Sequence, residues 1–164
     1  MTRVQAAISA ALLSALILQP GAGYTQSPDF TGRWVIAKTD IAPWADALQK
    51  GGLKEEHRLL GQAVIFGAHS VAGPSPLGCP HAVYVIHEDT ADLLFEGELA
   101  EPDHKGRARD AVALSRAIGM TTRMVLTLET GCSEVAFHRV APDTLVFGLN
   151  DRIYTLHRAP AHEP

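Results

Sequence analysis

The histidines are the first residues to consider for chemistry, because imidazole binds metals and exchanges protons near neutral pH. The chain has eight of them, but no His-x-x-x-His or His-Glu-x-x-His motif occurs. His81 and His87 are six apart, and on one strand their Cα atoms would be about 20 Å apart, too far for one ion. His138 and His157 could meet only if their strands pair. We therefore expect no metal site, and histidines that are either exposed or satisfied in the core.

Two carboxylates are the next candidates. Glu96 and Glu98 alternate with apolar residues in 93–99, so a strand there would place both on one face. Paired carboxylates can divide acid and base roles, although the same alternation is typical of a half-solvated strand. Asp89 has the sequence context of a turn residue. Since there is no Gly-x-Ser-x-Gly elbow and no phosphate-binding glycine loop, the sequence identifies no catalytic residue and no cofactor.

The first 23 residues have the three parts of a secretory signal. Arg3 is their only charge, an apolar run covers 6–18, and small residues follow a Pro-Gly breaker. The run is shorter than the roughly 20 residues that span a bilayer. We predict cleavage after Gly23 and a periplasmic or secreted product; the alternative is a buried core helix.

The remaining residues, 24–164, have the length of a single domain with a sizeable core. They carry 13 Lys and Arg against 18 Asp and Glu. This acidic balance argues against nucleic-acid binding, which depends on clustered Lys and Arg. We also expect no integral membrane segment after signal cleavage, because no second long apolar stretch occurs.

Cys79 and Cys132 are the only cysteines. In an oxidising compartment an even pair in a small domain most often forms a disulfide. A reactive thiol is the alternative, but no Cys-x-x-Cys is present and Cys79 lies in a turn-like Gly-Cys-Pro. We predict a structural disulfide. It would tether the Pro- and Gly-rich loop 73–80. This loop is either a structural connection or a stiff loop that serves recognition.

The elements that must position these residues are mostly strands. Eight segments have strand patterns, and their short spacing favours an antiparallel barrel or sandwich; they are 30–39, 62–66, 82–87, 93–99, 123–128, 134–140, 144–149 and 152–158. Asn150-Asp151 fits a two-residue hairpin turn between the last two. One amphipathic helix is predicted over 107–118, with Asp103 as a candidate cap and Gly119 as its stop.

The segment 43–60 follows the first strand, and we expect two short helical turns in it. Trp44 lies at its start. It could cover the mouth of a barrel and stack on a ligand, or it could plug the barrel end as part of the core.

The sequence Phe-Thr-Gly-Arg-Trp at 30–34 resembles the Gly-x-Trp signature that opens the first strand of lipocalins and related calycin barrels. In that superfamily an arginine near the end of the last strand packs over the signature tryptophan. The resemblance implies that Gly32, Trp34 and Arg158 close one end of a lipocalin-like barrel of about eight strands, with Arg152 as a second candidate. The helix at 107–118 departs from the family pattern, in which the main helix follows the barrel.

Three functions are open at this point. The leading one is an exported, non-enzymatic binding module of the bacterial envelope, with a small apolar molecule or another protein as its partner. The chain is also similar, at Ala-Pro-Trp 42–44, to small uncharacterised exported bacterial proteins. A small periplasmic hydrolase or isomerase is the second, and predicts that Glu96, Glu98, His87 or His138 faces a cavity with a shifted pKa. A protein-inhibitor or immunity-type module, acting through loop 73–80, is the third.

Overall fold

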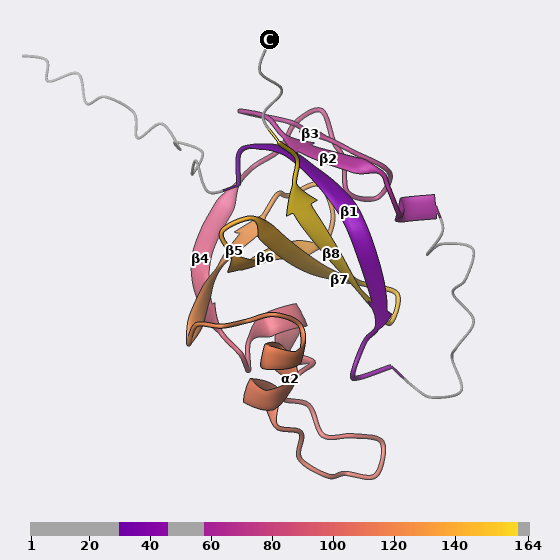
Figure 1. Ribbon diagram of the computed structural model, residues 1–164, viewed down its shortest axis with the longest axis vertical. Helices are drawn as coiled ribbons and strands as arrows, with labels where there is room; N and C mark the ends of the chain where they lie inside the picture. Colours follow the sequence, from indigo (N-terminus) through magenta and orange to yellow (C-terminus); the bar gives the residue numbers. More distant parts are fainter. Residues whose placement is uncertain (1–29, 46–57, 161–164) are drawn as a thin grey trace, which may run out of the picture.

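The computed structural model describes residues 30–45 and 58–160. Eight antiparallel strands form one sheet that curls strongly into a half-barrel (Figure 1). The strands are β1 (Gly32–Ile41), β2 (Ala63–Phe66), β3 (Val71–Ala72), β4 (Val85–Thr90), β5 (Met124–Glu129), β6 (Ala136–Ala141), β7 (Thr144–Leu149) and β8 (Arg152–Arg158). Their order is β3-β2-β1-β8-β7-β6-β5-β4, so β1 and β8, the first and last of these strands in the sequence, pair with each other. The predicted mainly β class with eight strands and one helix is confirmed. The predicted signal peptide, 1–23, and most of 43–60 lie outside the described residues.

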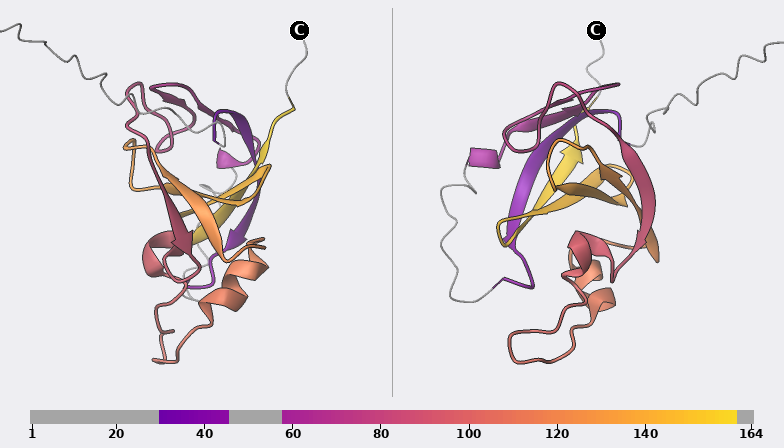
Figure 2. Two further views of the ribbon diagram at one scale, coloured as in Figure 1. Left: turned by 90° about the vertical axis from the view of Figure 1, so that its left-hand side faces the viewer. Right: turned by 180° about the vertical axis from the view of Figure 1, so that it is seen from behind.

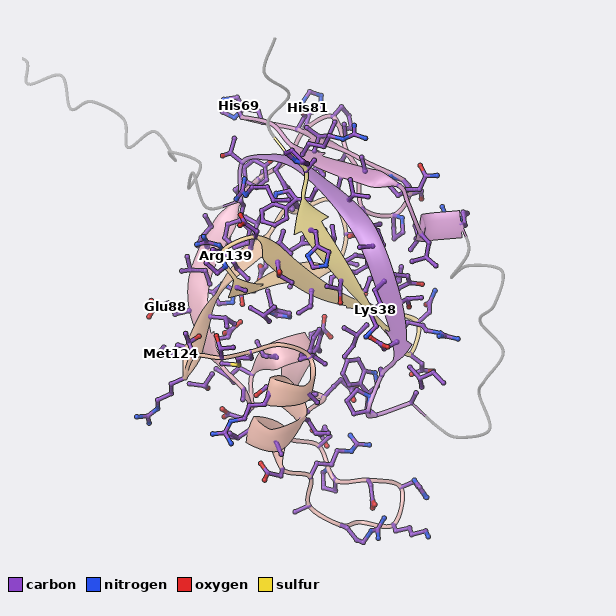
Figure 3. The ribbon with its side chains drawn as sticks, viewed as in Figure 1. Lys38, His69, His81, Glu88, Met124 and Arg139 are labelled. Carbon is purple, nitrogen blue, oxygen red and sulfur yellow. A yellow bond between two sulfur atoms is a disulfide. The ribbon has the colours of Figure 1, made fainter. Side chains whose placement is uncertain are left out.

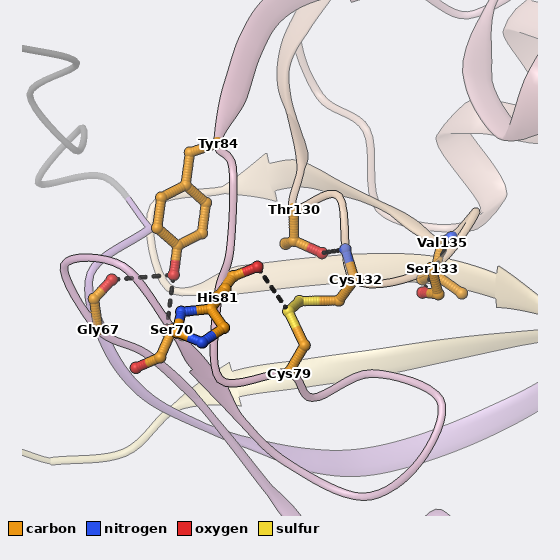
Figure 4. The surroundings of a disulfide bond; sticks show 9 residues. All are labelled: Gly67, Ser70, Cys79, His81, Tyr84, Thr130, Cys132, Ser133 and Val135. Carbon is orange, nitrogen blue, oxygen red and sulfur yellow. Dashed lines mark hydrogen bonds between the residues drawn. A yellow bond between two sulfur atoms is a disulfide. The ribbon is translucent and has the colours of Figure 1, made fainter.

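The sheet's two edge strands, β3 and β4, do not pair with each other in the part of the chain that the structure describes. The connection between them bridges the gap instead. The hydroxyl of Tyr84 lies 2.9 Å from the carbonyl oxygen of Gly67 and 2.8 Å from that of Ser70 (Figure 4). The predicted disulfide between Cys79 and Cys132 is present and ties the connection to the turn between β5 and β6. A covalent bond and side-chain contacts thus hold the half-barrel together where strand pairing is missing.

Trp34 of β1 is fully buried and is the cross-strand partner of Arg158 in β8. The guanidinium carbon of Arg158 lies 4.2 Å from the centre of the indole ring, and Nη1 of Arg158 donates to the carbonyl oxygen of Thr31 at 2.7 Å. Gly32 has φ of +110°, a conformation that favours glycine. A cation–π contact therefore joins β1, the first strand of the described chain, to β8, the last.

Apolar side chains pack on both faces of the sheet. In β7, Leu145 and Phe147 belong to one buried cluster, whereas Val146 between them belongs to a second. Strands β1, β2, β5, β6, β7 and β8 all contribute to the first cluster, which must therefore lie inside the curl. Large aromatic side chains with no more than 1 % exposure fill that space; they are Phe30, Trp34, Phe66, Phe137, Phe147 and Tyr154.

Two short helical segments lie at one end of the half-barrel (Figure 2), and residues of both belong to the second cluster or pack against it. These are the 3₁₀ turn η1 (Leu94–Gly97) and the helix α2 (Ala111–Ala117). Neither they nor any other helix in the described ranges has the length and apolarity needed to cross a membrane.

The strand predicted over 93–99 is wrong, because this segment forms η1. Phe95 and Glu96 have φ of 54° and 59°, a left-handed conformation that no strand contains. Leu94 and Phe95 are adjacent in sequence and both buried, which a strand with one solvated face does not allow. Glu96 and Glu98 therefore do not share a strand face. The two-residue strand β3 was not predicted, and β4 begins and ends three residues later than expected.

The helix α2 is also shorter than the 107–118 predicted. It begins after Asp110, whose side chain accepts a hydrogen bond from the N–H of Ala113 at 3.0 Å. Asp103, the expected cap, instead accepts from the N–H groups of Lys105 and Arg107 in the preceding loop. The helix ends before Gly119, which has φ of +100° as a helix stop requires.

Candidate functional site

A row of polar side chains crosses three strands on the face that carries the second cluster. Thr127 of β5 is the cross-strand partner of His87 in β4 and of His138 in β6. Asp89 lies two residues after His87, on the same face of β4. Strand register alone therefore brings four polar groups together.

The hydrogen bonds in this row fix the proton positions. Thr127 Oγ1 donates to Asp89 Oδ2 at 2.6 Å, so its single proton is used. Its 2.9 Å contact with His138 Nδ1 must then be donated by the imidazole. His138 Nε2 carries the lone pair and accepts from the N–H of Phe95 at 3.3 Å. Both ring nitrogens of His138 thus have partners, and one of them holds the left-handed turn at Phe95 in place.

Burial lowers the pKa of His138 to about 4. The Asp89 carboxylate acts in the opposite direction, and His87 lowers the pKa further. The imidazole is therefore neutral at pH 7. A proton on Nε2 would also face the N–H of Phe95, donor against donor. With both nitrogens engaged and a low pKa, His138 is a poor general base near neutral pH.

A pocket of about 290 Å³ opens beside His138. Its walls come from η1, the start of β6, the β7–β8 hairpin and Trp44, which follows the end of β1. The N–H of Ala42 donates to the carbonyl oxygen of Asp151 at 2.9 Å, which ties the end of β1 to the hairpin. Elements distant in sequence are thus fastened to one another around the pocket.

Aromatic rings form one wall of this pocket. The ring centroids of Trp44 and Phe95 lie 5.0 Å apart. Those of His138 and Phe95 lie 4.8 Å apart, and these two rings meet in a T-shaped arrangement. Gly148 of β7 faces the same rings. A Cβ there would lie 3.1 Å from Cδ1 of Phe95 and 3.5 Å from Cζ2 of Trp44. The absence of a side chain at this position therefore leaves room beside the aromatic wall.

Carboxylates surround the rest of the pocket. Glu96, Glu134 and Asp151 line it, and none of them forms an ion pair within the described ranges. Glu96 and Asp151 both lie in left-handed turns, with φ of 59° and 58°. The left-handed turns therefore place Glu96 and Asp151 at the pocket.

A second and larger hollow, about 500 Å³, lies between the end of β4, α2 and the segment before β5. Arg116 and Arg123 are its cationic lining residues, and both side chains are exposed. No aromatic ring lines it. Because this hollow has no aromatic wall and its cationic residues are exposed, we take the smaller pocket beside His138 as the candidate site.

The structure separates the predicted site residues. Of the four proposed for an enzyme, Glu96 and His138 line the pocket. His87 is an exposed residue next to Asp89, with 3.2 Å between Nε2 and Oδ2. The carbonyl oxygen of Glu98 accepts from Arg109 at 3.0 Å.

The other histidines are distributed around the molecule. His138 and His157 do not meet, because β7 lies between their strands. His69 and His81 lie at the end of the half-barrel opposite α2 (Figure 3). Within the residues described, no three His, Cys, Asp or Glu side chains are grouped as metal ligands.

Sequence reasoning missed Asp89 and Thr127. Asp89 was interpreted as a turn residue, but it lies in β4 and is 7 % exposed. The signal that could have found them is a polar residue at a position where a strand is otherwise apolar, as Thr127 is between Leu126 and Leu128. The strand register that joins the two is not visible in the sequence.

Comparisons of the chain with protein-family models, curated proteins and solved structures gave no match. No family membership therefore assigns a function to the pocket.

Proposed function

We propose that this protein is an exported, non-enzymatic binding module and that the pocket beside His138 is its ligand site. The observation that carries the proposal is Trp44, a half-buried indole that forms part of the pocket wall. Large aromatic side chains that are neither fully buried nor isolated are frequent anchors for small molecules. The pocket's 290 Å³ is near the lower end of the volumes that hold small ligands, about 300–1,000 Å³.

The filled interior moves the proposed site away from the centre of the half-barrel. Aromatic and aliphatic side chains occupy the curl, so a ligand there would have to displace core residues. The pocket at the η1 end needs no such displacement. A small ligand can enter it while the first cluster stays packed.

Preorganisation supports a binding role. The Phe95 N–H is held by His138, and the hairpin carrying Asp151 is held by Ala42. A site whose walls are already fixed loses little conformational entropy when a ligand binds. Phe95 and Thr127 engage both nitrogens of His138, so the geometry favours binding over acid–base catalysis by this residue.

Export remains part of the proposal. The apolar run at 6–18 motivates it, and the disulfide between Cys79 and Cys132 supports it, since such bonds persist in oxidising compartments.

The test is a ligand-detected NMR screen of small aromatic and amine-bearing molecules against the purified protein. Molecules that bind should lose about tenfold or more in affinity in Trp44→Ala, because the variant removes the half-buried indole ring of the wall. Ile65→Ala is the matched control: it truncates an apolar side chain of 38 % exposure on β2, outside the pocket. The proposal fails if no molecule binds, or if those that bind are equally weakened by both variants or by neither.

A further inference from the structure

The chemistry of the pocket specifies a ligand class beyond the binding role. Its charged lining residues are all acidic: Glu96, Glu134 and Asp151. No Lys or Arg is among its described lining residues, and His138 is neutral at pH 7 because burial lowers its pKa to about 4. The field inside the pocket is therefore negative at neutral pH.

Within the described ranges these carboxylates, of which Glu96 and Glu134 are exposed, have no cationic partner. None of the three forms an ion pair with another described residue, and Asp151 is partly buried. Like charges around one hollow repel each other and are stabilised by a cation between them. Their placement alone would suit any cation, including a hydrated metal ion.

The aromatic wall indicates which kind of cation fits the pocket. The faces of indole and phenyl rings carry negative electrostatic potential and attract organic cations, most strongly at Trp. The rings of Trp44 and Phe95 have centroids 5.0 Å apart and are tilted by 41°, so they form a packed corner in which the half-buried Trp44 is the more accessible ring and Phe95 is 7 % exposed. Such a corner suits a bulky ammonium group with an apolar surface, which a hydrated metal ion lacks.

We infer that the pocket beside His138 selects small organic cations, with an ammonium group held between the Trp44–Phe95 corner and the surrounding carboxylates. This inference rests on the binding function proposed above. The aromatic rings fix the position of the ammonium group. The carboxylates favour a cation over a neutral or an anionic ligand.

Three probes of nearly identical shape test the sign of the charge. Choline is cationic, 3,3-dimethylbutan-1-ol is its neutral counterpart, and 3,3-dimethylbutanoate is anionic. Their dissociation constants are measured by NMR titration of the full chain at pH 7 and low salt. We expect choline to bind about tenfold or more tightly than the alcohol, and the carboxylate to bind more weakly than either.

A charge-neutral variant isolates the contribution of the carboxylates. In Glu134→Gln/Asp151→Asn the preference for choline over the alcohol should fall several-fold. Asn accepts the left-handed φ of position 151, so the hairpin turn is retained. The control, Glu88→Gln/Glu101→Gln, removes two exposed carboxylates outside the pocket and should leave the preference unchanged.

Each result bears on a different part of the argument. Equal binding of choline and the alcohol, or tighter binding of the carboxylate, overturns the cation inference and leaves the binding function in place. If none of the three probes shifts the Trp44 or Gly148 resonances, the cation inference is also overturned. The binding function itself stands or falls on the separate screen with Trp44→Ala.

Discussion

His138 shows how one buried residue can control local backbone shape. Its Nε2 accepts the N–H of Phe95, a residue 43 positions away that has a left-handed φ of 54°. Left-handed conformations cost about 1–3 kcal/mol in non-glycine residues and persist only where surrounding contacts require them. The neutral imidazole is such a contact, since the protonated form has no lone pair for this N–H. The shape of the pocket wall therefore depends on the proton state of His138.

A pH dependence of stability follows from this residue. The pKa of His138 is about 4 in the folded protein and 6.5 in an ordinary histidine. Between these values the unfolded chain binds a proton that the folded chain does not. Above pH 6.5 the proton equilibrium of His138 does not lower the free energy of unfolding. As the pH falls toward 4, the free energy of unfolding decreases by about 3 kcal/mol in total.

Urea unfolding at several pH values between 7.5 and 4 measures this loss. His138→Gln should show a smaller loss than the wild type, because the titrating group is gone. The exposed His157 provides the control, and His157→Gln should keep the wild-type pH dependence. Identical curves for wild type and His138→Gln would contradict the assignment.

At the scale of elements, the beginning of α2 depends on a single cap. Asp110 accepts the N–H of Ala113, so Asp110→Ala should lower the local stability of the helix by about 1 kcal/mol. Hydrogen exchange of the α2 amides reports this change. Asp110→Asn keeps an accepting oxygen and should restore most of the protection. Asp103→Ala should leave α2 unchanged, since Asp103 bonds within its own loop; equal effects at both positions would refute this placement of the cap.

The elements also show what the sequence could predict. Strands β7 and β8 agree with the prediction in both bounds, because each is continuous in pattern and Asn150-Asp151 provides the left-handed hairpin turn. Residues 93–99, which contain η1, were predicted as a strand because Glu96 and Glu98 alternate with apolar residues. The hydrogen bond that the Phe95 N–H donates to His138 stabilises the turn and is a tertiary contact, which local periodicity does not contain.

The candidate site divides in the same way. Trp44, Glu96 and His138 were candidates from residue type alone, and they meet in one pocket. Asp89 and Thr127 were not recognised, since only the pairing of β4, β5 and β6 places them beside His138. Residue chemistry could therefore nominate parts of the site, whereas strand register was needed to assemble them.

At the scale of the whole molecule, an open sheet must be held against unfolding from its edges. The edge strands β3 and β4 are joined by the connection between them, through Tyr84 and through the disulfide. The candidate pocket lies between η1, the start of β6 and the β7–β8 hairpin, and its lining residues Glu134 and Val135 follow Cys132 by two and three positions. The disulfide that closes the half-barrel and the candidate site therefore share the turn between β5 and β6, although neither cysteine lines the pocket.

Removal of the disulfide should affect the stability of the fold more than the binding of ligand. Cys79 and Cys132 are 53 residues apart, and closing a loop of that length reduces the entropy of the unfolded chain. Cys79→Ser/Cys132→Ser should lower the free energy of unfolding by about 4 kcal/mol, measured by urea denaturation. Ligands that depend on Trp44 should keep their affinity in the folded fraction, because the pocket's hydrogen bonds do not involve either cysteine. An unchanged denaturation midpoint would mean that the contacts of Tyr84 suffice to close the half-barrel. A loss of ligand affinity at full folding would mean that the disulfide also fixes the part of the pocket wall that Glu134 and Val135 form.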